Sequence, residues 1–274
     1  MNADAMLAAL DLPASCRVDQ RVPKKLLLEN GAPTAADKRQ INDGIEELFW
    51  VAALKPTTIG VAEYRDAIRE YLEIAVLRLT LRARAKAARL IELVYRAIPY
   101  PVLLITEISH EATKNTKAGK MDSPKLRAIA CDGFSISAAH KRWAQNEAGK
   151  TVIEGELVVA ELNPERDAEF WPAFSAAMAL GRQPRGALFA LYQGWVDTLL
   201  ALKAARVTGV FGLAADGDHA AARQEALREC ARLDAEIARL RAAAAKEKQM
   251  ARRVELNLEL KLAEAARNAA RERL

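Results

Sequence analysis

The stretch YLEIAVLRLTLRARAKAARLIELVYRAIPYPVLLITEI, residues 71–108, decides the fold of this chain. Residues 71–80 partly alternate apolar and polar side chains, which favours a strand, although this run could also continue into the helix that follows. Residues 85–98 repeat apolar positions at helical spacing and end at Pro99. The next run, from Pro101, is short, continuous and apolar, as in a buried strand. Strand, helix and strand in this order predict a βαβ unit with parallel strands.

Two further strand signals follow this unit. Residues 125–143, KLRAIACDGFSISAAHKRW, carry Asp132-Gly133 between two strand-like runs, and this dipeptide is a type I′ hairpin signal. The sequence QNEAGK, residues 145–150, predicts another turn, and TVIEGELVVAEL, residues 151–162, predicts a third strand. This meander would extend the sheet.

Helices are predicted on both sides of these strands. Thr34 and Asp37 can cap a helix whose apolar positions recur at helical spacing from Ile41 to Ala52. Pro56 then ends it, because the residue before a proline disfavours the helical conformation. After the meander, residues 164–180 and 186–206 have the pattern of two helices joined by a GRQPRG turn.

The chain ends in a segment without glycine or proline after Gly217, built mainly from Ala, Arg, Glu, Leu and Lys. This composition is typical of a long helix. Its apolar residues follow alternating steps of four and three, interrupted at Glu247. The seam consists of Ala226, Cys230, Leu233, Ile237, Leu240, Ala244, Ala251, Val254 and Leu258. Such a seam must be buried, either in a coiled coil with a partner or in a helical hairpin that folds near residues 245–249.

These elements predict an α+β protein. We expect a mixed sheet with a βαβ unit and a β-meander, followed by an all-helical region that ends in a long coiled-coil-like helix or helical hairpin. The expected domains are an α+β core at residues 1–162, a helical extension packed on the core at 163–215, and the charged helix or hairpin at 216–274.

Composition limits the classes of function. The chain has 274 residues, of which 51% are hydrophobic, so it can bury a core. Its three cysteines are widely separated and match no metal-ligand spacing, and no signal peptide or long apolar segment is evident, so we expect a cytoplasmic protein. The net charge is +5, and residues 219–274 contribute +4 of it, from 13 Lys/Arg against 9 Asp/Glu.

Several separated motifs occur in an order that resembles an uncharacterised bacterial family of domains of unknown function. They are VPKKLLLENG (22–31), DKRQINDGIEELFWVAALKPTTIGV (37–61), AIPYPVLLI (97–105), AAHKRW (138–143) and LYQGWVDTLLALKAARVTGVF (191–211). Members of that family are commonly encoded beside SNF2-type helicases and DNA methyltransferases in restriction-like or phage-defence loci. The resemblance implies an accessory defence component and carries over no catalytic residues.

We expect no catalytic residues, no metal and no cofactor, and favour a protein that is not an enzyme. The chain lacks a phosphate-binding glycine loop and a nucleophile in a recognisable setting. One alternative remains open, a metal-dependent nuclease with a degenerate carboxylate site built from Glu73, Glu107 and Asp132. Another is a purely structural scaffold for other proteins.

Nucleic-acid phosphates are the first expected partner. A polar loop after residue 108 carries five cations that can neutralise phosphates without reading bases, namely Lys114, Lys117, Lys120, Lys125 and Arg127. In FSISAAHKRW, residues 134–143, strand alternation places His140 and Arg142 on one face and Lys141 and Trp143 on the other. We therefore expect Lys141, Arg142 and Trp143 to add phosphate and stacking contacts to DNA or RNA, rather than to form one catalytic cluster.

Protein partners are the second expectation. A seam with small residues and flanks of mixed charge suits a partner helix better than the DNA major groove. We expect Leu233, Ile237, Leu240, Val254 and Leu258 to mediate assembly, either with a helicase or methyltransferase of the same locus or with a second copy of the chain. No membrane partner is expected.

Overall fold

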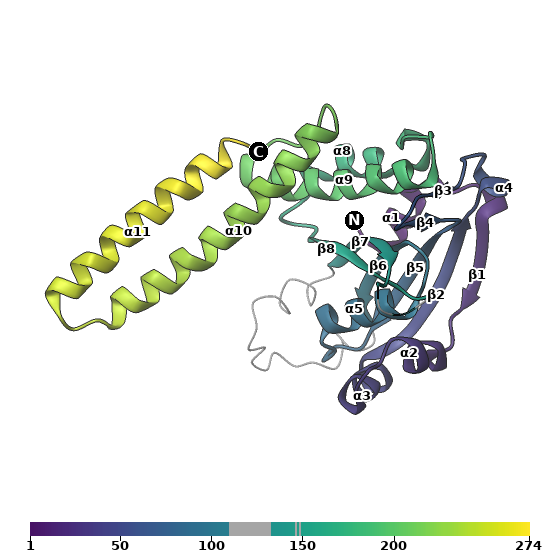
Figure 1. Cartoon of the computed structure of the whole chain (residues 1–274), viewed down its shortest axis with the longest axis horizontal. Coiled ribbons are helices and arrows are strands. Elements are labelled where there is room, and N and C mark those ends of the chain that lie inside the picture. Colours follow the sequence, from purple (N-terminus) through teal and green to yellow (C-terminus); the bar gives the residue numbers. More distant parts are fainter. Residues whose placement is uncertain (110–132, 146, 148) are drawn as a thin grey trace. The chain divides into compact units, whose positions relative to one another are not determined.

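The α+β class is confirmed by the computed structural model, which describes residues 1–109, 133–145, 147 and 149–274 (Figure 1). A six-stranded mixed sheet has the strand order β1-β2-β5-β6-β7-β8, and β3 and β4 form a separate two-stranded sheet. The chain divides into two compact units, Met1–Leu199 and Leu200–Leu274. No helix among the described residues is both long and apolar enough to cross a membrane.

The strands are β1 (Arg17–Arg21), β2 (Ile45–Leu54), β3 (Tyr64–Arg65), β4 (Glu70–Tyr71), β5 (Ile74–Leu81), β6 (Val102–Ile108), β7 (Phe134–Trp143) and β8 (Thr151–Leu162). The helices are α1 (Ala3–Ala9), α2 (Lys24–Asn30), α3 (Ala35–Gly44), α4 (Pro56–Ile59), α5 (Ala87–Ala97), α8 (Trp171–Met178), α9 (Leu188–Thr208), α10 (Gly217–Lys246) and α11 (Met250–Arg271), with short 3₁₀ turns η1 (Ala14–Cys16) and η2 (Leu180–Arg182).

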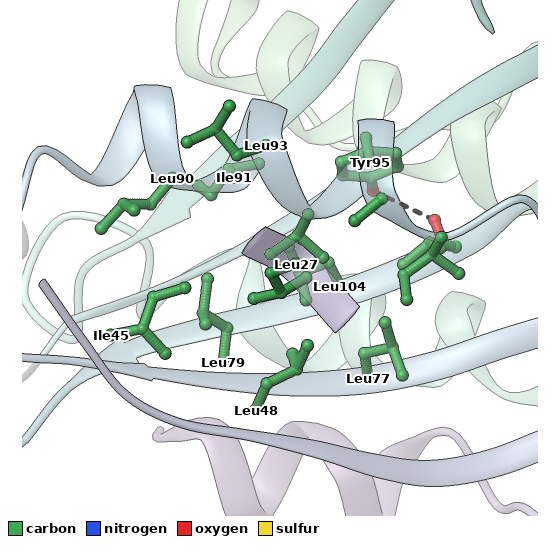
Figure 2. Packing of buried hydrophobic residues seen from close by; sticks show 14 of the residues in the cluster. Leu27, Ile45, Leu48, Leu77, Leu79, Leu90, Ile91, Leu93, Tyr95 and Leu104 are labelled. Carbon is green, nitrogen blue, oxygen red and sulfur yellow. Dashed lines mark hydrogen bonds between the residues drawn. The ribbon is translucent and has the colours of Figure 1, made fainter. Parts of the chain in front are cut away.

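The predicted βαβ unit is confirmed as β5-α5-β6. The two strands are parallel, in a register that runs from Ala75 opposite Val102 to Leu81 opposite Ile108. Helices α2 and α5 cover one face of the sheet, and their buried side chains interlock with those of β2, β5 and β6 (Figure 2). The residues labelled in that view are Leu27, Ile45, Leu48, Leu77, Leu79, Leu90, Ile91, Leu93, Tyr95 and Leu104. This apolar packing is the main stabilising contribution to the first unit.

The other face of the sheet is covered by α1, α8 and the first part of α9. The buried Tyr192 of α9 places its hydroxyl at the β6–β7 ladder, where it accepts from the Ala139 N–H at 2.9 Å and donates to the Val102 carbonyl at 2.6 Å. One turn further along α9, the indole Nε1–H of Trp195 donates to the Met178 carbonyl of α8 at 2.9 Å. These two side chains tie α9 to the sheet and to α8.

We expect Tyr192→Phe to lower the free energy of unfolding by about 1–3 kcal/mol, because it leaves the buried Ala139 N–H without its partner. The Val102 carbonyl would keep its bond from Tyr95, at 3.0 Å. Urea unfolding at neutral pH measures the loss. Tyr100→Phe is the matched control, since Tyr100 is 36% exposed. An equal loss in both variants would contradict this account.

The helix predicted from Thr34 to Ala52 is wrong beyond Gly44. Thr34 does cap α3, through a bond from the Asp37 N–H at 3.1 Å, but the chain then enters β2. The apolar residues Ile45 and Leu48 both belong to the buried cluster that packs against α5, although they lie three residues apart. A register irregularity between Ile45 and Glu47 adds one residue to β2 and changes the spacing of inward side chains from two to three. A spacing of three residues between inward side chains is also typical of a helix, so the sequence pattern of this strand resembles a helical one.

The strand predicted at residues 151–162 is confirmed as β8, the edge strand next to β7. The β7–β8 pairing is antiparallel, and its register shifts between Ala138 opposite Val158 and His140 opposite Glu154. Strand β8 therefore holds two extra residues at this point. Gly155 lies there with a φ of 70°, a left-handed conformation that glycine adopts without a Cβ clash.

In the second unit the C-terminal segment is a helical hairpin, one of the two predicted alternatives. Helices α10 and α11 lie side by side and antiparallel, joined by a turn at residues 247–249 (Figure 1). Two ion pairs link the helices, between Arg241 and Glu264 at 2.7 Å and between Arg267 and Asp234 at 3.1 Å. Because both pairs are exposed, apolar packing contributes more to the hairpin than they do.

Candidate functional site

Strand β7 places His140, Lys141 and Arg142 in three different surroundings. His140 faces α9, where its ring lies 5.0 Å from that of Phe189 and 5.3 Å from that of Tyr192. Lys141 faces the opposite side, at the end of α5. His140 and Lys141 therefore lie on opposite faces of β7, as the strand pattern predicts.

His140 is held as a neutral, largely buried side chain. Its Nδ1 lies 2.5 Å from the hydroxyl of Tyr71. Burial lowers the pKa of His140, although the side chain of Gln193 and the charge of Glu154 favour its protonated form. Burial also raises the pKa of Tyr71, so the phenol keeps its proton and can donate it to the imidazole. This pair connects β4 to β7 and has the properties of a packing contact.

The acids near His140 are engaged by an arginine. Arg69 forms a bidentate pair with Glu154 of β8, at 2.6 and 2.7 Å, and a second pair with Asp66 at 3.2 Å. Its guanidinium also lies 5.5 Å from the ring centroid of Phe189. Because the Arg69–Glu154 ion pair is bidentate, it is a strong interaction between the β3–β4 hairpin and the six-stranded sheet. It leaves Glu154 engaged in an ion pair.

Lys141 is only 3% exposed and serves as a cap for α5. Its Nζ donates to the Tyr95 carbonyl at 2.7 Å and to the Ile98 carbonyl, two acceptors at the C-terminal end of that helix. Burial lowers its pKa to about 7. The predicted contact between Lys141 and a phosphate does not fit this arrangement, because the amine faces backbone carbonyls in the interior rather than solvent.

Arg142 lies in a groove of about 760 Å³ between the α2–α3 connection, α5 and the β7–β8 hairpin. The groove is lined by Glu29, Asn30, Gly31, Ala32, Pro33, Glu92, Arg96, Arg142, Ala144, Gln145, Glu147, Lys150, Thr151, Val152 and Ile153. One guanidinium nitrogen of Arg142 donates to the neighbouring Trp143 carbonyl at 3.1 Å. Trp143 itself is partly buried, and its backbone N–H donates to the Ile68 carbonyl at 2.8 Å.

The other predicted phosphate contacts cannot be placed on this surface. Lys114, Lys117, Lys120, Lys125 and Arg127 lie outside the described residues. Of the eight predicted nucleic-acid contacts, the structure therefore describes three, and of these three Arg142 is the one that lines this groove.

The two described carboxylates of the alternative nuclease site, Glu73 and Glu107, are not brought together. Glu73 precedes β5 and pairs with Lys55 at 3.0 Å, whereas Glu107 lies near the end of β6 and pairs with Arg78. In the parallel register Glu107 lies opposite Thr80, so Glu73 is roughly 23 Å away along the strand. Asp132 lies outside the described residues. Within those residues, no group of three or more His, Cys, Asp or Glu side chains is placed to hold a metal ion.

The five predicted protein-interaction residues divide between two surfaces of the hairpin. Leu233, Ile237 and Leu240 are buried on α10, whereas Val254 and Leu258 of α11 are 52% and 57% exposed. The sequence pattern predicts a single seam that contains all five, and this is wrong for Val254 and Leu258. In α11 the side chains that face α10 include Leu256 and Ala270 instead.

Two further residues extend the exposed surface of α11, and the sequence prediction missed them. Met250 is 67% exposed and Leu262 is 72% exposed. Together with Val254 and Leu258 they are spaced four residues apart, so they form one stripe along the helix. We call these four residues the α11 stripe. The sequence signal for this stripe is the four-residue spacing of Met250, Val254, Leu258 and Leu262, a second apolar series in a helix that also carries apolar residues on its buried side.

Comparisons with known proteins give one match. Neither the curated proteins nor the solved structures include a significant match to this chain. A protein-family model does match, over residues 10–266, which is most of the chain.

Proposed function

The family matched over this span is described as a domain of unknown function (DUF4391), the chain belongs to it, and from this premise we propose that the protein is a non-enzymatic accessory subunit that assembles through α11. The observation that carries the proposal is the α11 stripe. Its four large apolar side chains are each at least half exposed, on a helix whose opposite side already packs against α10.

The stripe is unusual for a solvent-facing helix surface. A helix that packs on a single neighbour normally has one apolar face and a polar face opposite. Helix α11 has apolar residues on both, and the second series covers three turns from Met250 to Leu262. Burying two such side chains against a partner helix gains about 3–6 kcal/mol, enough to hold a complex together.

We extend the proposal to the partners that the family resemblance suggests. These are a helicase or methyltransferase of a bacterial anti-phage defence or restriction-like locus, and the phosphate backbone of DNA or RNA. The support for nucleic acid comes from the sequence, in the five cations between residues 114 and 127. A purely structural scaffold would share the α11 stripe and differ by not binding nucleic acid, so retention of an oligonucleotide at two salt concentrations separates the two.

The test is the double variant Val254→Gln with Leu258→Gln. We expect it to weaken capture of co-expressed neighbouring proteins, or self-association, by about a hundredfold, because two apolar anchors are lost. Multi-angle light scattering and co-purification measure the effect. The fold should persist, since substitutions at exposed positions change stability by only about 0.5 kcal/mol.

The matched control is the double variant Arg253→Gln with Glu259→Gln on the same helix. Both residues are exposed, and their combined replacement leaves the net charge unchanged. We expect it to retain assembly. Unchanged mass and complex formation in the Val254/Leu258 variant would show that the α11 stripe has no role in assembly.

A further inference from the structure

We propose that the groove around Arg142 binds an extended acidic peptide of a partner protein, which adds to the sheet at β8 and places a carboxylate on the Arg142 guanidinium. All of the lining residues belong to the unit Met1–Leu199. This site is therefore separate from the α11 stripe and goes beyond the assembly role proposed for it.

The first observation is the charge of Arg142. Among the described residues no carboxylate pairs with it, and its one described hydrogen bond goes to the Trp143 carbonyl. A guanidinium offers five N–H donors in a planar fork, so most of its capacity remains for a ligand. The side chain is partly buried, which strengthens its attraction to an anion relative to a fully solvated one.

The second observation is that the other charges of the groove are already paired. Glu92 binds Arg89 at 2.8 Å and lies 3.9 Å from Arg96, while Lys150 pairs with Glu147. At the rim, Glu29 lies 3.7 Å from Lys25. The groove thus carries three acids and three bases. A nucleic-acid strand needs a continuous basic surface to neutralise successive phosphates, whereas a single carboxylate needs one free guanidinium.

The third observation is the position of β8 at the sheet edge. In the described sheet β8 pairs with β7 alone, and its first residues, Thr151 to Ile153, all line the groove. Successive side chains of a strand point to opposite faces, so a groove that touches three in a row meets the strand at its backbone. An unpaired strand edge can accept an extended peptide through main-chain hydrogen bonds.

The apolar lining indicates the residues that accompany the carboxylate. Val152 is 38% exposed, and Ala32 and Pro33 line the groove from the α2–α3 connection. An apolar side chain next to the acidic residue would contact these groups. The volume of about 760 Å³ lies within the range of about 300–1,000 Å³ that is usual for ligand sites.

Phage-displayed random octapeptides, selected on the full-length chain, test the proposal. We expect enrichment of peptides that combine an Asp or Glu with a neighbouring apolar residue. The most enriched peptide, made synthetically with fluorescein, then serves as the probe in fluorescence anisotropy. Its Asp→Asn or Glu→Gln analogue, and a version with N-methylated backbone, should each bind at least about tenfold more weakly.

The substitution Arg142→Gln in the protein should weaken binding of the probe by at least about tenfold. The matched control Arg182→Gln removes an exposed arginine that lines no part of the groove and should leave binding unchanged. The Val254/Leu258 variant should also retain binding, which separates this site from the α11 stripe.

Three outcomes would overturn the proposal. One is the absence of acidic peptides from the selected set. Another is equal binding of the probe by the Arg142→Gln variant and the unaltered chain. The third is a result in which a short single-stranded oligonucleotide binds in a way that depends on Arg142, whereas binding of the peptide does not depend on it.

Discussion

Replacing Lys141 with Met is expected to remove a contribution to stability that rises by at most about 2–3 kcal/mol between about pH 6 and pH 9. The cause is the burial of the amine, which lowers its pKa in the folded protein from 10.5 to about 7. The two carbonyl acceptors favour the ammonium form and limit this lowering.

The direction of the effect follows from proton binding. Above about pH 7 the folded chain releases the Lys141 proton, whereas the unfolded chain keeps it up to about pH 10.5. The unfolded state therefore binds more protons in this window, and the free energy of unfolding increases as the pH rises. Below the window both states are protonated, and the folded state retains the full cost of a buried charge.

Urea titrations of the unaltered protein and of Lys141→Met at several pH values measure this difference. The comparison cancels the other groups that titrate in alkaline solution, including Cys16 and Cys230, whose pKa values burial raises. Lys150→Met, at a lysine that is 72% exposed, is the matched control and should keep the rise. A parallel pH profile for Lys141→Met would show that Lys141 is charged in the folded protein throughout.

Replacing Trp195 with Ala is expected to lower the free energy of unfolding by about 3–5 kcal/mol, the largest loss we expect from a single substitution. The indole is fully buried on α9, and its Nε1–H satisfies the Met178 carbonyl of α8. The substitution removes apolar packing, opens a cavity and leaves that acceptor without its partner. This is a large fraction of the stability of a typical domain.

Two further variants separate these contributions. Trp195→Phe retains an aromatic ring and loses the N–H donor, so it should recover about half of the loss. Trp143→Ala removes the same side chain from a partly exposed position and should cost less. Calorimetry measures all three. A loss at Trp195 no larger than that at Trp143 would contradict the packing of α9 described above.

The sequence was sufficient where local patterns and long-range structure agree. The β5-α5-β6 unit was predictable because its helix is bounded by Pro99 and its strands are apolar enough to be buried on both sides. The division of FSISAAHKRW between two faces was also predictable, because β7 carries no extra residue and strand alternation holds along it.

The sequence was insufficient where a distant strand decides the outcome. The pattern from Ile45 to Ala52 looks helical only because pairing with β5 introduces irregularities into β2. The role of Lys141 depends on carbonyls more than forty residues away, at the end of α5, which no local pattern reveals. The groove at Arg142 combines three segments that are far apart in the chain, so the sequence alone does not predict which of its charged side chains form ion pairs.

The irregularity in β8 has a consequence for changes in chain length. Because it adds two residues rather than one, the side chains of β8 keep the same order of inward and outward positions on both sides of it. Removing a pair of residues around Gly155 would shorten the edge strand without inverting either half. Removing one residue would exchange the inward-facing and outward-facing side chains in one half of the strand. The β7–β8 pairing should therefore accept length changes at this point only in steps of two.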